Sequence, residues 1–349
     1  MFLHNFWYIA AFRHELGAKP LRRVMLGQPV VLYRTADGKA VALEDRCVHR
    51  NVPLSHGTVR ADGTLQCRYH GLVYDRAGAC VHIPEQTRVP PDAKVKCYPL
   101  VERNEWVWVW MGDPAEADPA RIPNYRWFDR TGWKAKTARL HVKCDYRLIV
   151  DNLLNMAHLP FVHPHTIGSE GVVKDAKVTV KRDGRTVRLS RQMHDIEPPP
   201  TYKTAGGFEG NVNRWQTIDF IPPAFFEFDT GVIEAGHDIP DTSDPDALRG
   251  NVRMLSRHTM HGVVPETAAT SHYYVGFSYD PAELKDDVAM FLFDSVYKTF
   301  LEDVELLELQ QTNMALMPGA RTIDIVSDTA GLQAARIIEE LEKDEAAKR

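Results

Sequence analysis

The chain has 349 residues and a formal net charge of −5, with 44% hydrophobic and 26% charged residues. This length predicts about two domains, and the scattered Lys and Arg residues exclude the basic cluster typical of a nucleic-acid-binding protein. No run approaches the roughly 20 apolar residues of a membrane span, and five cysteines in so long a chain do not suggest a disulfide framework, so we expect a reducing, cytoplasmic location.

The first third of the chain is predicted to consist of short strands and turns. Residues 29–45 form two β-rich runs around Asp37-Gly38, a pattern typical of a hairpin. Residues 105–114 form one apolar strand that Gly-Asp-Pro closes, and a segment with several prolines follows it. We therefore expect an all-β domain over residues 1–114 and a second domain over residues 115–349.

The second domain is predicted to mix strands with helices. Residues 145–163 have helical apolar spacing, and we expect Pro160 to end or kink that helix. A hairpin around Asp183-Gly184 and further strand-like runs follow. A long helix over about 283–316 and a C-terminal helix complete the domain. This order of elements predicts an α+β fold.

A paired cysteine and histidine motif combines Cys47 with His49 and Cys67 with His70. Each segment offers one thiolate and one imidazole, so two facing loops would supply two Cys to one iron and two His to another. That combination is the ligand set of a Rieske [2Fe–2S] centre. A structural zinc site is the alternative, although zinc fingers usually pair Cys with Cys and His with His. We expect the remaining cysteines to be small buried residues: Cys80, Cys97 and Cys144.

The segments "CVH" and "CRYHG" resemble the cluster loops of Rieske proteins, specifically those of their oxygenase branch. A Rieske cluster transfers single electrons and does not activate O₂, so this resemblance implies a second metal site. His158 and His163 are candidate ligands of Fe(II) in a two-His-one-carboxylate site. An unbroken helix would separate them, but Pro160 could supply a break that brings both rings to one metal. His165, which follows Pro164, is the weaker candidate and is expected at the surface or beside a ligand.

The carboxylate of this site is predicted on the long helix. On a helical wheel, Asp303 falls at the edge of an apolar stripe, whereas Glu302 and Glu305 are expected to point away toward the polar side. A carboxylate on a core-facing stripe is costly unless it is paired or bound to a metal. Asp303 is therefore the predicted third ligand.

Several segments together resemble the oxygenase subunits of vanillate O-demethylase and toluenesulfonate methyl-monooxygenase, which are Rieske non-heme iron oxygenases. These segments are "CVHR", "CRYHGL", "VWMGDP", "DYRLIVDNLL", "AHLPFVH" and "FLEDVELLELQQTN". The resemblance implies an N-terminal Rieske domain and a helix-grip catalytic domain, in which a curved antiparallel sheet holds a helix. It also implies homotrimers in which each cluster serves the iron of the neighbouring subunit. The implied ligands are Cys47, His49, Cys67 and His70 for the [2Fe–2S] cluster, and His158, His163 and Asp303 for Fe(II).

Two differences from known Rieske proteins refine this comparison. Respiratory-chain Rieske proteins carry an extra cysteine in each cluster loop, and Val52 and Tyr69 stand at those positions, which implies the oxygenase branch. Family members usually carry an aspartate three residues before the first iron histidine, where this chain has Asn155. An amide cannot ionise, so any proton coupling at this position should differ. Asp151 is the fallback acid, and Asn152 lies beside it.

The sequence thus predicts the oxygenase component of a Rieske monooxygenase that attacks a methyl or methoxy group of a small aromatic acid. It would use O₂ and NAD(P)H, with electrons from a reductase that contains flavin and an iron–sulfur centre. A cis-dihydroxylating dioxygenase uses the same irons and is an alternative. A non-catalytic Rieske electron carrier is a third reading, against which the large second domain argues. Residues that could contact the substrate, although solvation or core packing would also explain them, are Arg214, Arg257, His258, Phe161, Phe225, Phe226 and Tyr273.

Overall fold

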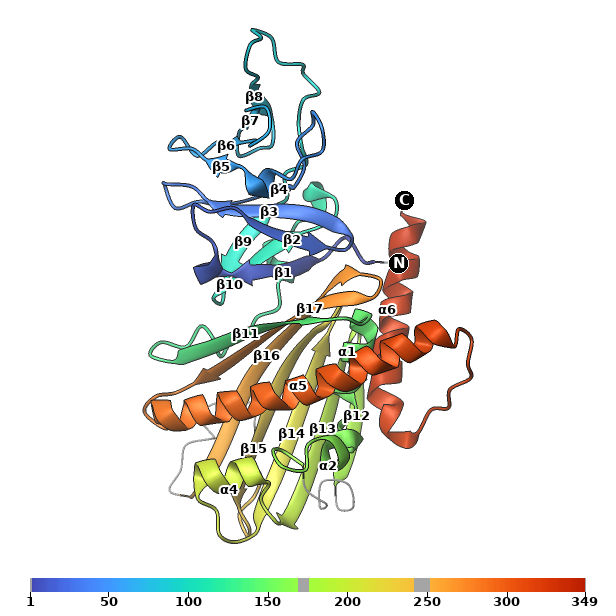
Figure 1. The fold of residues 1–349 in the computed structure, drawn as a ribbon. Coiled ribbons are helices and arrows are strands. Elements are labelled where there is room, and N and C mark those ends of the chain that lie inside the picture. Colours follow the sequence, from blue (N-terminus) through green and yellow to red (C-terminus); the bar gives the residue numbers. More distant parts are fainter. Residues whose placement is uncertain (1, 169–175, 242–251, 349) are drawn as a thin grey trace. The chain divides into compact units, whose positions relative to one another are not determined.

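The computed structural model describes residues 2–168, 176–241 and 252–348 and separates the chain into two compact units (Figure 1). The first unit comprises Met1–Pro123 and Val264–Ala268, and the second comprises Asn124–Val263 and Ala269–Arg349. The units thus divide at residue 123, and the boundary expected after residue 114 stays a prediction.

The first unit consists of short antiparallel strands in three small sheets, with the orders β1-β10-β9, β2-β3-β4 and β5-β6-β7-β8. Its strands are β1 (Trp7–Phe12), β2 (Leu21–Met25), β3 (Gln28–Arg34), β4 (Ala40–Glu44), β5 (Thr58–Val59), β6 (Leu65–Gln66), β7 (Val73–Tyr74), β8 (Cys80–His82), β9 (Leu100–Arg103) and β10 (Trp106–Trp110). The 3₁₀ turns η1 (Arg13–Glu15) and η2 (Leu54–His56) lie between these strands, and η3 (Pro114–Glu116) and η4 (Pro119–Arg121) follow β10.

The apolar patterns of the sequence explain these strands. The hairpin expected around Asp37-Gly38 is formed by β3 and β4, and Gly38 supplies the positive φ that its turn requires. Every residue of β10 is buried, as the continuous apolar run predicts. The second and third sheets and their loops share a core that contains the side chains of Cys47 and Cys67, so the packing of this unit fixes where those two thiols lie.

The second unit is built on one seven-stranded antiparallel sheet with the order β11-β17-β16-β15-β14-β13-β12. Its strands are β11 (Lys134–Val142), β12 (Lys177–Asp183), β13 (Thr186–Ile196), β14 (Val212–Ile221), β15 (Phe225–Glu234), β16 (Met254–Thr267) and β17 (Thr270–Tyr279). Its helices and 3₁₀ turns are α1 (Tyr146–Leu154), η5 (Met156–His158), α2 (Leu159–Val162), α4 (Pro200–Gly206), α5 (Asp286–Leu316), η6 (Val326–Asp328) and α6 (Thr329–Ala347).

Helix α5 lies across one face of this sheet (Figure 1). The ring of Phe300 on α5 contacts His261 of β16 and Tyr273 of β17, at centroid distances of 5.5 and 5.4 Å, which identifies the face that the helix covers. We call this surface the inner face of the sheet. The expected α+β fold is confirmed, with an all-β first unit and a second unit in which an antiparallel sheet holds a long helix.

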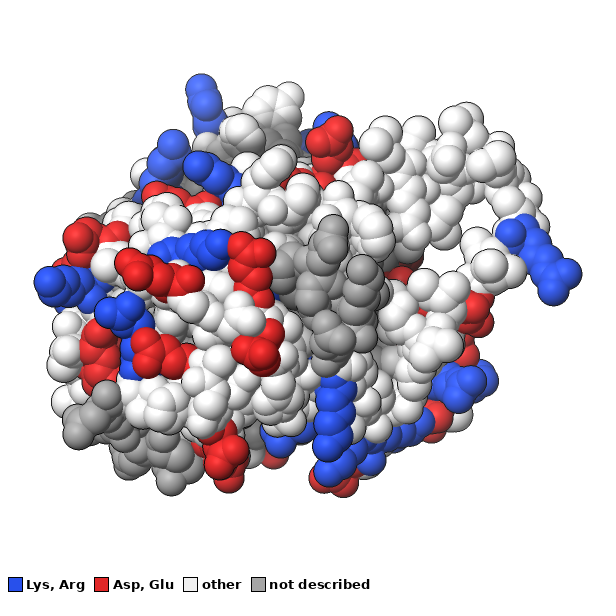
Figure 2. Space-filling view, turned by 90° about the horizontal axis from the view of Figure 1, so that it is seen from below, with Lys and Arg blue, Asp and Glu red and all other residues white. Residues whose placement is uncertain are grey.

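Charged side chains of both signs lie side by side on the face that Figure 2 shows, without a large region of one sign. This mixture matches the small net charge of the chain. In the described part of the chain, none of the helices combines the length and the apolar character that crossing a membrane would need.

Candidate metal centres

Two loops of nearly identical backbone geometry carry the paired cysteine and histidine motif. In each loop the N–H of the cysteine donates to the carbonyl five residues on, at 2.8 Å for Cys47 and 2.7 Å for Cys67. The N–H four residues on donates back to the cysteine carbonyl, at 2.9 and 3.1 Å. Asn51 and Gly71 fill this fourth position, and both have positive φ, a conformation that Asn and Gly tolerate best. The loops are therefore related by an approximate twofold repeat.

The four candidate ligands form a buried pair and an exposed pair. The thiols of Cys47 and Cys67 are buried and hydrogen-bonded to one another, and burial raises the pKa of the Cys67 thiol. The rings of His49 and His70 are exposed, with centroids 4.5 Å apart. Two sulfurs below two imidazoles suit a dinuclear cluster whose inner iron takes Cys and whose outer iron takes His. The donor set therefore fits a [2Fe–2S] cluster better than one tetrahedral zinc.

Tyr74 on β7 is a residue that the sequence analysis missed. Its hydroxyl lies 3.2 Å from Sγ of Cys47 and accepts a hydrogen bond from the N–H of Val48 at 3.0 Å. Because a thiolate only accepts hydrogen bonds, the hydroxyl would donate to a metal-bound Cys47 sulfur. No spacing rule links Tyr74 to Cys47 in the sequence, since the contact depends on how β7 packs against the first loop.

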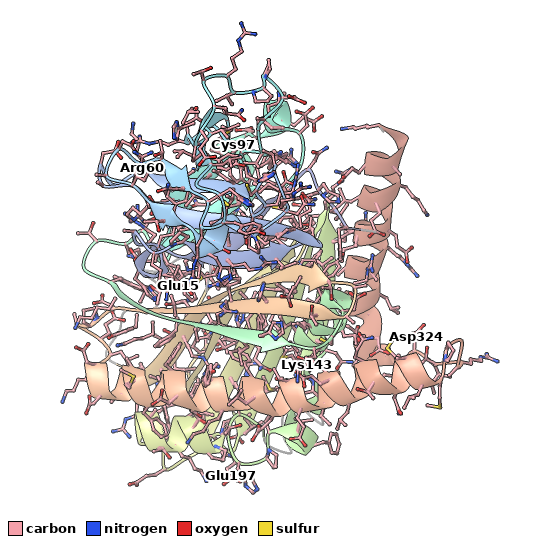
Figure 3. The ribbon with its side chains drawn as sticks, turned by 45° about the horizontal axis from the view of Figure 1, so that its top comes forward. Glu15, Arg60, Cys97, Lys143, Glu197 and Asp324 are labelled. Atoms are coloured by element: carbon pink, nitrogen blue, oxygen red, sulfur yellow. The ribbon has the colours of Figure 1, made fainter. Side chains whose placement is uncertain are left out.

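All five cysteines are free thiols, so the two cluster loops are not braced by a disulfide. Cys80 and Cys144 are buried, as expected. Cys97 is only half-buried, and its thiol donates to the carbonyl of Arg76 at 3.4 Å (Figure 3 labels Cys97 in the first unit). The expectation that Cys97 is a buried residue was therefore wrong, because it lies on an irregular segment at the edge of the core.

The segment that carries the candidate iron histidines breaks at Asn155 and not at Pro160. Helix α1 ends before Asn155, whose side-chain oxygen accepts from Ala157 N–H at 2.9 Å and begins the 3₁₀ turn η5. Pro160 lies in the first turn of α2, where a missing N–H costs no helical hydrogen bond. The predicted break at Pro160 was therefore wrong.

The structure nonetheless brings three of the predicted side chains together. His158, at the start of α2, and His163, at its end, have ring centroids 5.3 Å apart. Their Nε2 atoms lie 3.4 and 3.1 Å from the same oxygen of Asp303 on α5. One ligand atom from each residue lies within 4.8 Å of the others, and only 7% of Asp303 is exposed. The carboxylate therefore meets both imidazoles in a nearly closed site.

Glu302 does not point away from this site, contrary to our expectation. Its carboxylate accepts a hydrogen bond from Nδ1 of His163 at 2.6 Å. Burial lowers the pKa of His163, but its contacts with Asp303 and Glu302 outweigh burial and raise it. Burial lowers the pKa of His158, and the charge of Asp303 opposes this effect only in part. Glu305 is exposed, as expected.

This donor set, two imidazole nitrogens and one carboxylate oxygen, fits the facial triad of non-heme Fe(II) enzymes. Such a triad binds one side of the metal and leaves its other coordination positions open. The hydrogen bond from Nδ1 of His163 to Glu302 leaves Nε2 as the metal-binding nitrogen of that ring. A zinc ion could use a similar donor set, but zinc would not need the cluster-type loops of the first unit. The assignment of His158, His163 and Asp303 as iron ligands stays a prediction.

The three residues predicted to act beside the iron have different surroundings. Asn152 donates to Oδ1 of Asp303 at 3.1 Å, so it contacts the triad directly. Asn155 donates to Oδ1 of Asp328 at 2.7 Å. The pKa of Asp151 is raised, mainly because burial desolvates its carboxylate and also because of the charges of Asp328 and Asp324. Their catalytic roles stay predictions, and Asp328 is the ionisable group that contacts Asn155.

The candidate substrate residues divide into buried and exposed groups. Phe161 is 80% exposed, so it is not packed in the core, and its contact with an arene substrate stays a prediction. His165 is exposed, as expected. Tyr273 is buried on the inner face of the sheet. The other candidates are also buried: Arg214, Phe225, Phe226, Arg257 and His258.

A cavity of about 340 Å³ opens elsewhere, beside Trp127, Arg188, Trp215 and Glu227. Arg188 and Trp215 alternate along their strands with the inner-face residues described below, so this cavity belongs to the opposite face of the sheet. It does not include the three residues of the candidate iron site.

Two family models match the chain. The Rieske [2Fe–2S] domain model matches residues 6–99, and the vanillate O-demethylase oxygenase C-terminal domain model matches residues 142–344. The first match covers both cluster loops, and the second covers the three residues of the candidate iron site. Each match agrees with the donor set found in that unit.

Curated relatives and a solved structure match nearly the whole length of the chain. The toluene-4-sulfonate monooxygenase system iron-sulfur subunit of Comamonas testosteroni is 38% identical over 96% of this chain and 95% of its own. The vanillate O-demethylase oxygenase subunit of a Pseudomonas species is 34% identical over 98% and 95%. The crystal structure of dicamba monooxygenase with non-heme iron and dicamba has a TM-score of 0.79 and 30% identity, covering 100% and 99%.

These matches identify the class of enzyme as well as the fold. The relatives are oxygenase components and monooxygenases, so the chain is an oxidoreductase and not an isolated electron carrier. A Rieske [2Fe–2S] domain is present, and the structural relative contains non-heme iron. The chain belongs to the Rieske oxygenase family, as an oxygenase subunit that joins a Rieske domain to a catalytic domain of the vanillate O-demethylase type.

Proposed function

We propose that this subunit removes a methyl group from, or hydroxylates a methyl group of, a small aromatic acid. One observation carries the proposal: a single chain holds two cysteines and two histidines on the cluster loops of one unit, and two histidines and one aspartate together in the other unit. Relatives named for toluene-4-sulfonate and vanillate support an aromatic acid as the substrate class.

The overall reaction balances as a monooxygenation. Two electrons from NAD(P)H and two protons reduce one atom of O₂ to water, while the other atom enters a C–H bond of the methyl group. A methoxy substrate then becomes a hemiacetal that loses formaldehyde, and an aryl methyl becomes an alcohol. When bound, the cluster supplies electrons one at a time and Fe(II) provides the open positions at which O₂ is activated.

The side chains of this protein position those groups and exclude water from the site. Cys47, His49, Cys67 and His70 would hold the cluster, with the hydroxyl of Tyr74 donating to one sulfur. In the second unit, Asn152 fixes Asp303 and Glu302 fixes the ring of His163. His163 is fully buried, which keeps bulk water away from that side of the metal.

The partners proposed for this subunit are an NAD(P)H-dependent flavin and iron–sulfur reductase and two further copies of the chain in a head-to-tail homotrimer. Exposed apolar side chains near both candidate sites support the trimer: Tyr69 is 62% exposed beside His70, and Phe161 lies between the iron histidines. Others follow the second half of α5 and the segment after it: Leu301, Leu306, Leu309, Leu316, Ile323, Ile325 and Val326. Because the proposed reaction consumes NAD(P)H, we propose that the protein works in the cytoplasm.

Product analysis tests the proposed reaction. The iron-loaded protein, a Rieske-oxygenase reductase and NADH are incubated under ¹⁸O₂ with methoxylated and methylated benzoates and benzenesulfonates. We expect formaldehyde from methoxy substrates, or a benzylic alcohol from methyl substrates, with one ¹⁸O atom in the organic product. A cis-diol with two ¹⁸O atoms would instead establish the dioxygenase alternative.

The variant Asp303→Ala separates the two metal centres in the same assay. We expect it to lose substrate-dependent O₂ uptake and product while the first unit keeps the spectrum of a reducible cluster. Glu305→Ala, two residues further along α5 and exposed, serves as the control and should keep full activity. Unchanged O₂ consumption by Asp303→Ala would contradict an oxygenase site at this position.

A further inference from the structure

A row of polar side chains crosses the inner face of the sheet. The register pairs Arg191 with Gln216, Gln216 with Thr230, and Thr230 with Arg257, so the four residues lie on one face across four adjacent strands. Arg214 lies two residues before Gln216 and shares that face. Three arginines thus gather on the buried side of the sheet, and Arg214 and Arg257 are only 0% and 8% exposed.

Two of these arginines hold the segments that carry the iron histidines. Nη1 of Arg191 donates to the carbonyl of Met156 at 3.0 Å, two residues before His158. Nη1 of Arg214 donates to the carbonyl of Ile167 at 3.0 Å, a few residues after His163. Their positions are therefore explained by the backbone groups they bind.

Arg257 lacks an equivalent explanation. Its Nε and Nη1 are buried and have no hydrogen-bond partner, and no carboxylate of the described residues forms an ion pair with it. The guanidinium lies over the ring of Tyr202, 5.9 Å from its centroid, and Arg214 lies over the same ring at 5.5 Å. A guanidinium stays charged at any physiological pH, and a buried unpaired charge is strongly unfavourable. The site therefore lacks an anion.

The charges of the two arginines also act on the buried hydroxyl of Tyr202. Burial raises the pKa of its hydroxyl, but the charges of Arg257 and Arg214 outweigh burial and lower it. Thr259 and His261 follow Arg257 on the same face of its strand, and the hydroxyl of Thr259 lies 2.9 Å from Nε2 of His261. Burial, and then the charge of Arg257, lowers the pKa of His261 to about 3, so this ring is neutral and does not compete for an anion.

Aromatic side chains connect Arg257 to the candidate iron site. His261 contacts Phe228 at a centroid distance of 4.3 Å and is 2.8 Å from the hydroxyl of Tyr273. Phe300 contacts both His261 and Tyr273 and lies one turn before Asp303 on α5. Apolar ring surfaces thus extend from the metal site toward a cation.

We propose that Arg257 binds the anionic group, carboxylate or sulfonate, of the aromatic substrate. The ring would then lie against His261, Tyr273 and Phe300, with its methyl or methoxy group toward the residues of the iron site. This inference rests on the proposed function and specifies it, because it makes Arg257 the residue that selects acids over neutral arenes. A guanidinium suits both anions, since each offers coplanar or clustered oxygens to its donors.

The test compares charged and neutral probes of nearly equal shape. Binding to the iron-loaded protein is measured anaerobically by calorimetry with 4-methoxybenzoate and 4-methoxybenzamide, and with 4-methylbenzenesulfonate and its sulfonamide. We expect each anion to bind at least about tenfold more tightly than its amide. Equal affinities of the native protein for acid and amide would overturn the proposal without any variant.

Variants then assign the preference to one side chain. Arg257→Met should weaken binding of the anions by about tenfold or more and leave binding of the amides within about twofold, while Arg257→Lys should retain part of the preference. Arg185→Met, at an exposed turn of the same sheet, is the matched control and should change neither. If Arg257→Met does not fold, the Lys variant decides, because an unchanged preference for every anion together with unchanged affinity would contradict a guanidinium-specific site.

These outcomes are separable from those of the product assay. Anion binding that depends on Arg257, in a protein that oxidises none of the probes, would support the anion site and reject the proposed reaction. Oxidation of the anions with unchanged KM in Arg257→Met would support the reaction and overturn the role of Arg257.

Discussion

At the scale of single residues, the candidate iron site depends on a hydrogen bond to the far side of a ligand. His163 directs Nε2 toward Asp303 and Nδ1 toward Glu302, so both ring nitrogens have a fixed partner. A carboxylate behind a metal-binding imidazole selects its tautomer and increases its basicity. Glu302 is therefore a positioning residue for the metal.

Glu302→Ala should weaken metal binding to the second unit by about 10- to 100-fold. Glu302→Gln should have a smaller effect, because an amide oxygen still accepts from Nδ1 but carries no charge. The measurement is a Co²⁺ titration of protein whose mononuclear site has been emptied, followed by visible absorbance against a competing chelator. Glu305→Ala is the exposed control, and a Glu302→Ala affinity equal to that of the native protein would disprove the role.

Glu227 on β15 offers a test of how burial affects stability. Burial of its side chain raises its pKa to about 7, so between the unfolded value of 4.5 and pH 7 the folded protein binds an extra proton. The stability that this group contributes is complete below about pH 4.5 and is lost as the pH rises through 7. Ionised Glu227 therefore destabilises the native state at alkaline pH.

Glu227→Gln should consequently stabilise the protein more at pH 8 than at pH 5.5. The difference should be roughly 1–2 kcal/mol, less than the full shift implies because the side chain is partly solvated. Urea unfolding at the two pH values, with fluorescence as the signal, measures it. Glu234→Gln, exposed at the end of the same strand, should show no such difference. An equal effect of Glu227→Gln at both pH values would contradict the raised pKa.

Residue identity and spacing were enough to predict which side chains gather, but not how each is held. Cys47, Cys67 and Asp303 were found because thiols in short loops and an acid on an apolar stripe are unusual in a sequence. Glu302 was misplaced because a helical wheel locates its Cα, whereas its long side chain bends back to His163. Tyr74 was missed because only tertiary packing brings it to Cys47.

At the scale of elements, the cluster loops depend on close approach of two backbone segments. Gly57 follows η2 and precedes β5, and a Cβ atom there would overlap the carbonyl oxygens of Gln66 and Leu54. Gln66 pairs with Thr58 across β5 and β6 and is directly followed by Cys67. A side chain at position 57 would therefore push against the strand that places the second thiol.

Gly57→Ala should lower the occupancy of the cluster and the thermal stability of the first unit, since backbone atoms cannot move aside as a flexible side chain can. The expected destabilisation is about 1–3 kcal/mol, as for other overpacked sites. Visible absorbance per chain and a thermal melt measure the two effects. Gly17→Ala, where a Cβ would meet open space, is the control, and a full cluster spectrum with an unchanged melt in Gly57→Ala would refute this reasoning.

Periodic apolar patterns explain why most elements could be predicted. Alternating apolar and polar residues around Asp-Gly predict the β3–β4 and β12–β13 hairpins, and a long apolar stripe predicts α5. The break at Asn155 could not be predicted from Pro160, because a proline in a first turn is compatible with a helix. Short α4 follows consecutive prolines and has no periodicity of its own, so only packing reveals it.

At the scale of the whole molecule, the chain combines two units that could each be predicted from local motifs. The cysteine and histidine loops identify the first, and the helical histidines with the acid on α5 identify the second. The assignment of Val264–Ala268 to the first unit could not be predicted, because these residues form the end of β16 and the start of the turn after it, and they lie far along the chain from the rest of that unit. No pattern in the sequence indicates that residues so far along the chain belong to the first unit.

The central claim is that one polypeptide carries both an electron-transferring cluster and a separate iron. The most direct measurement is a metal count on anaerobically prepared protein, combined with an electron paramagnetic resonance spectrum of the same sample after reduction with dithionite. We predict about three irons per chain and the signal of a reduced Rieske cluster, with Asp303→Ala losing about one iron and keeping that signal. Zinc in place of iron, or no cluster signal in the reduced protein, would contradict the account.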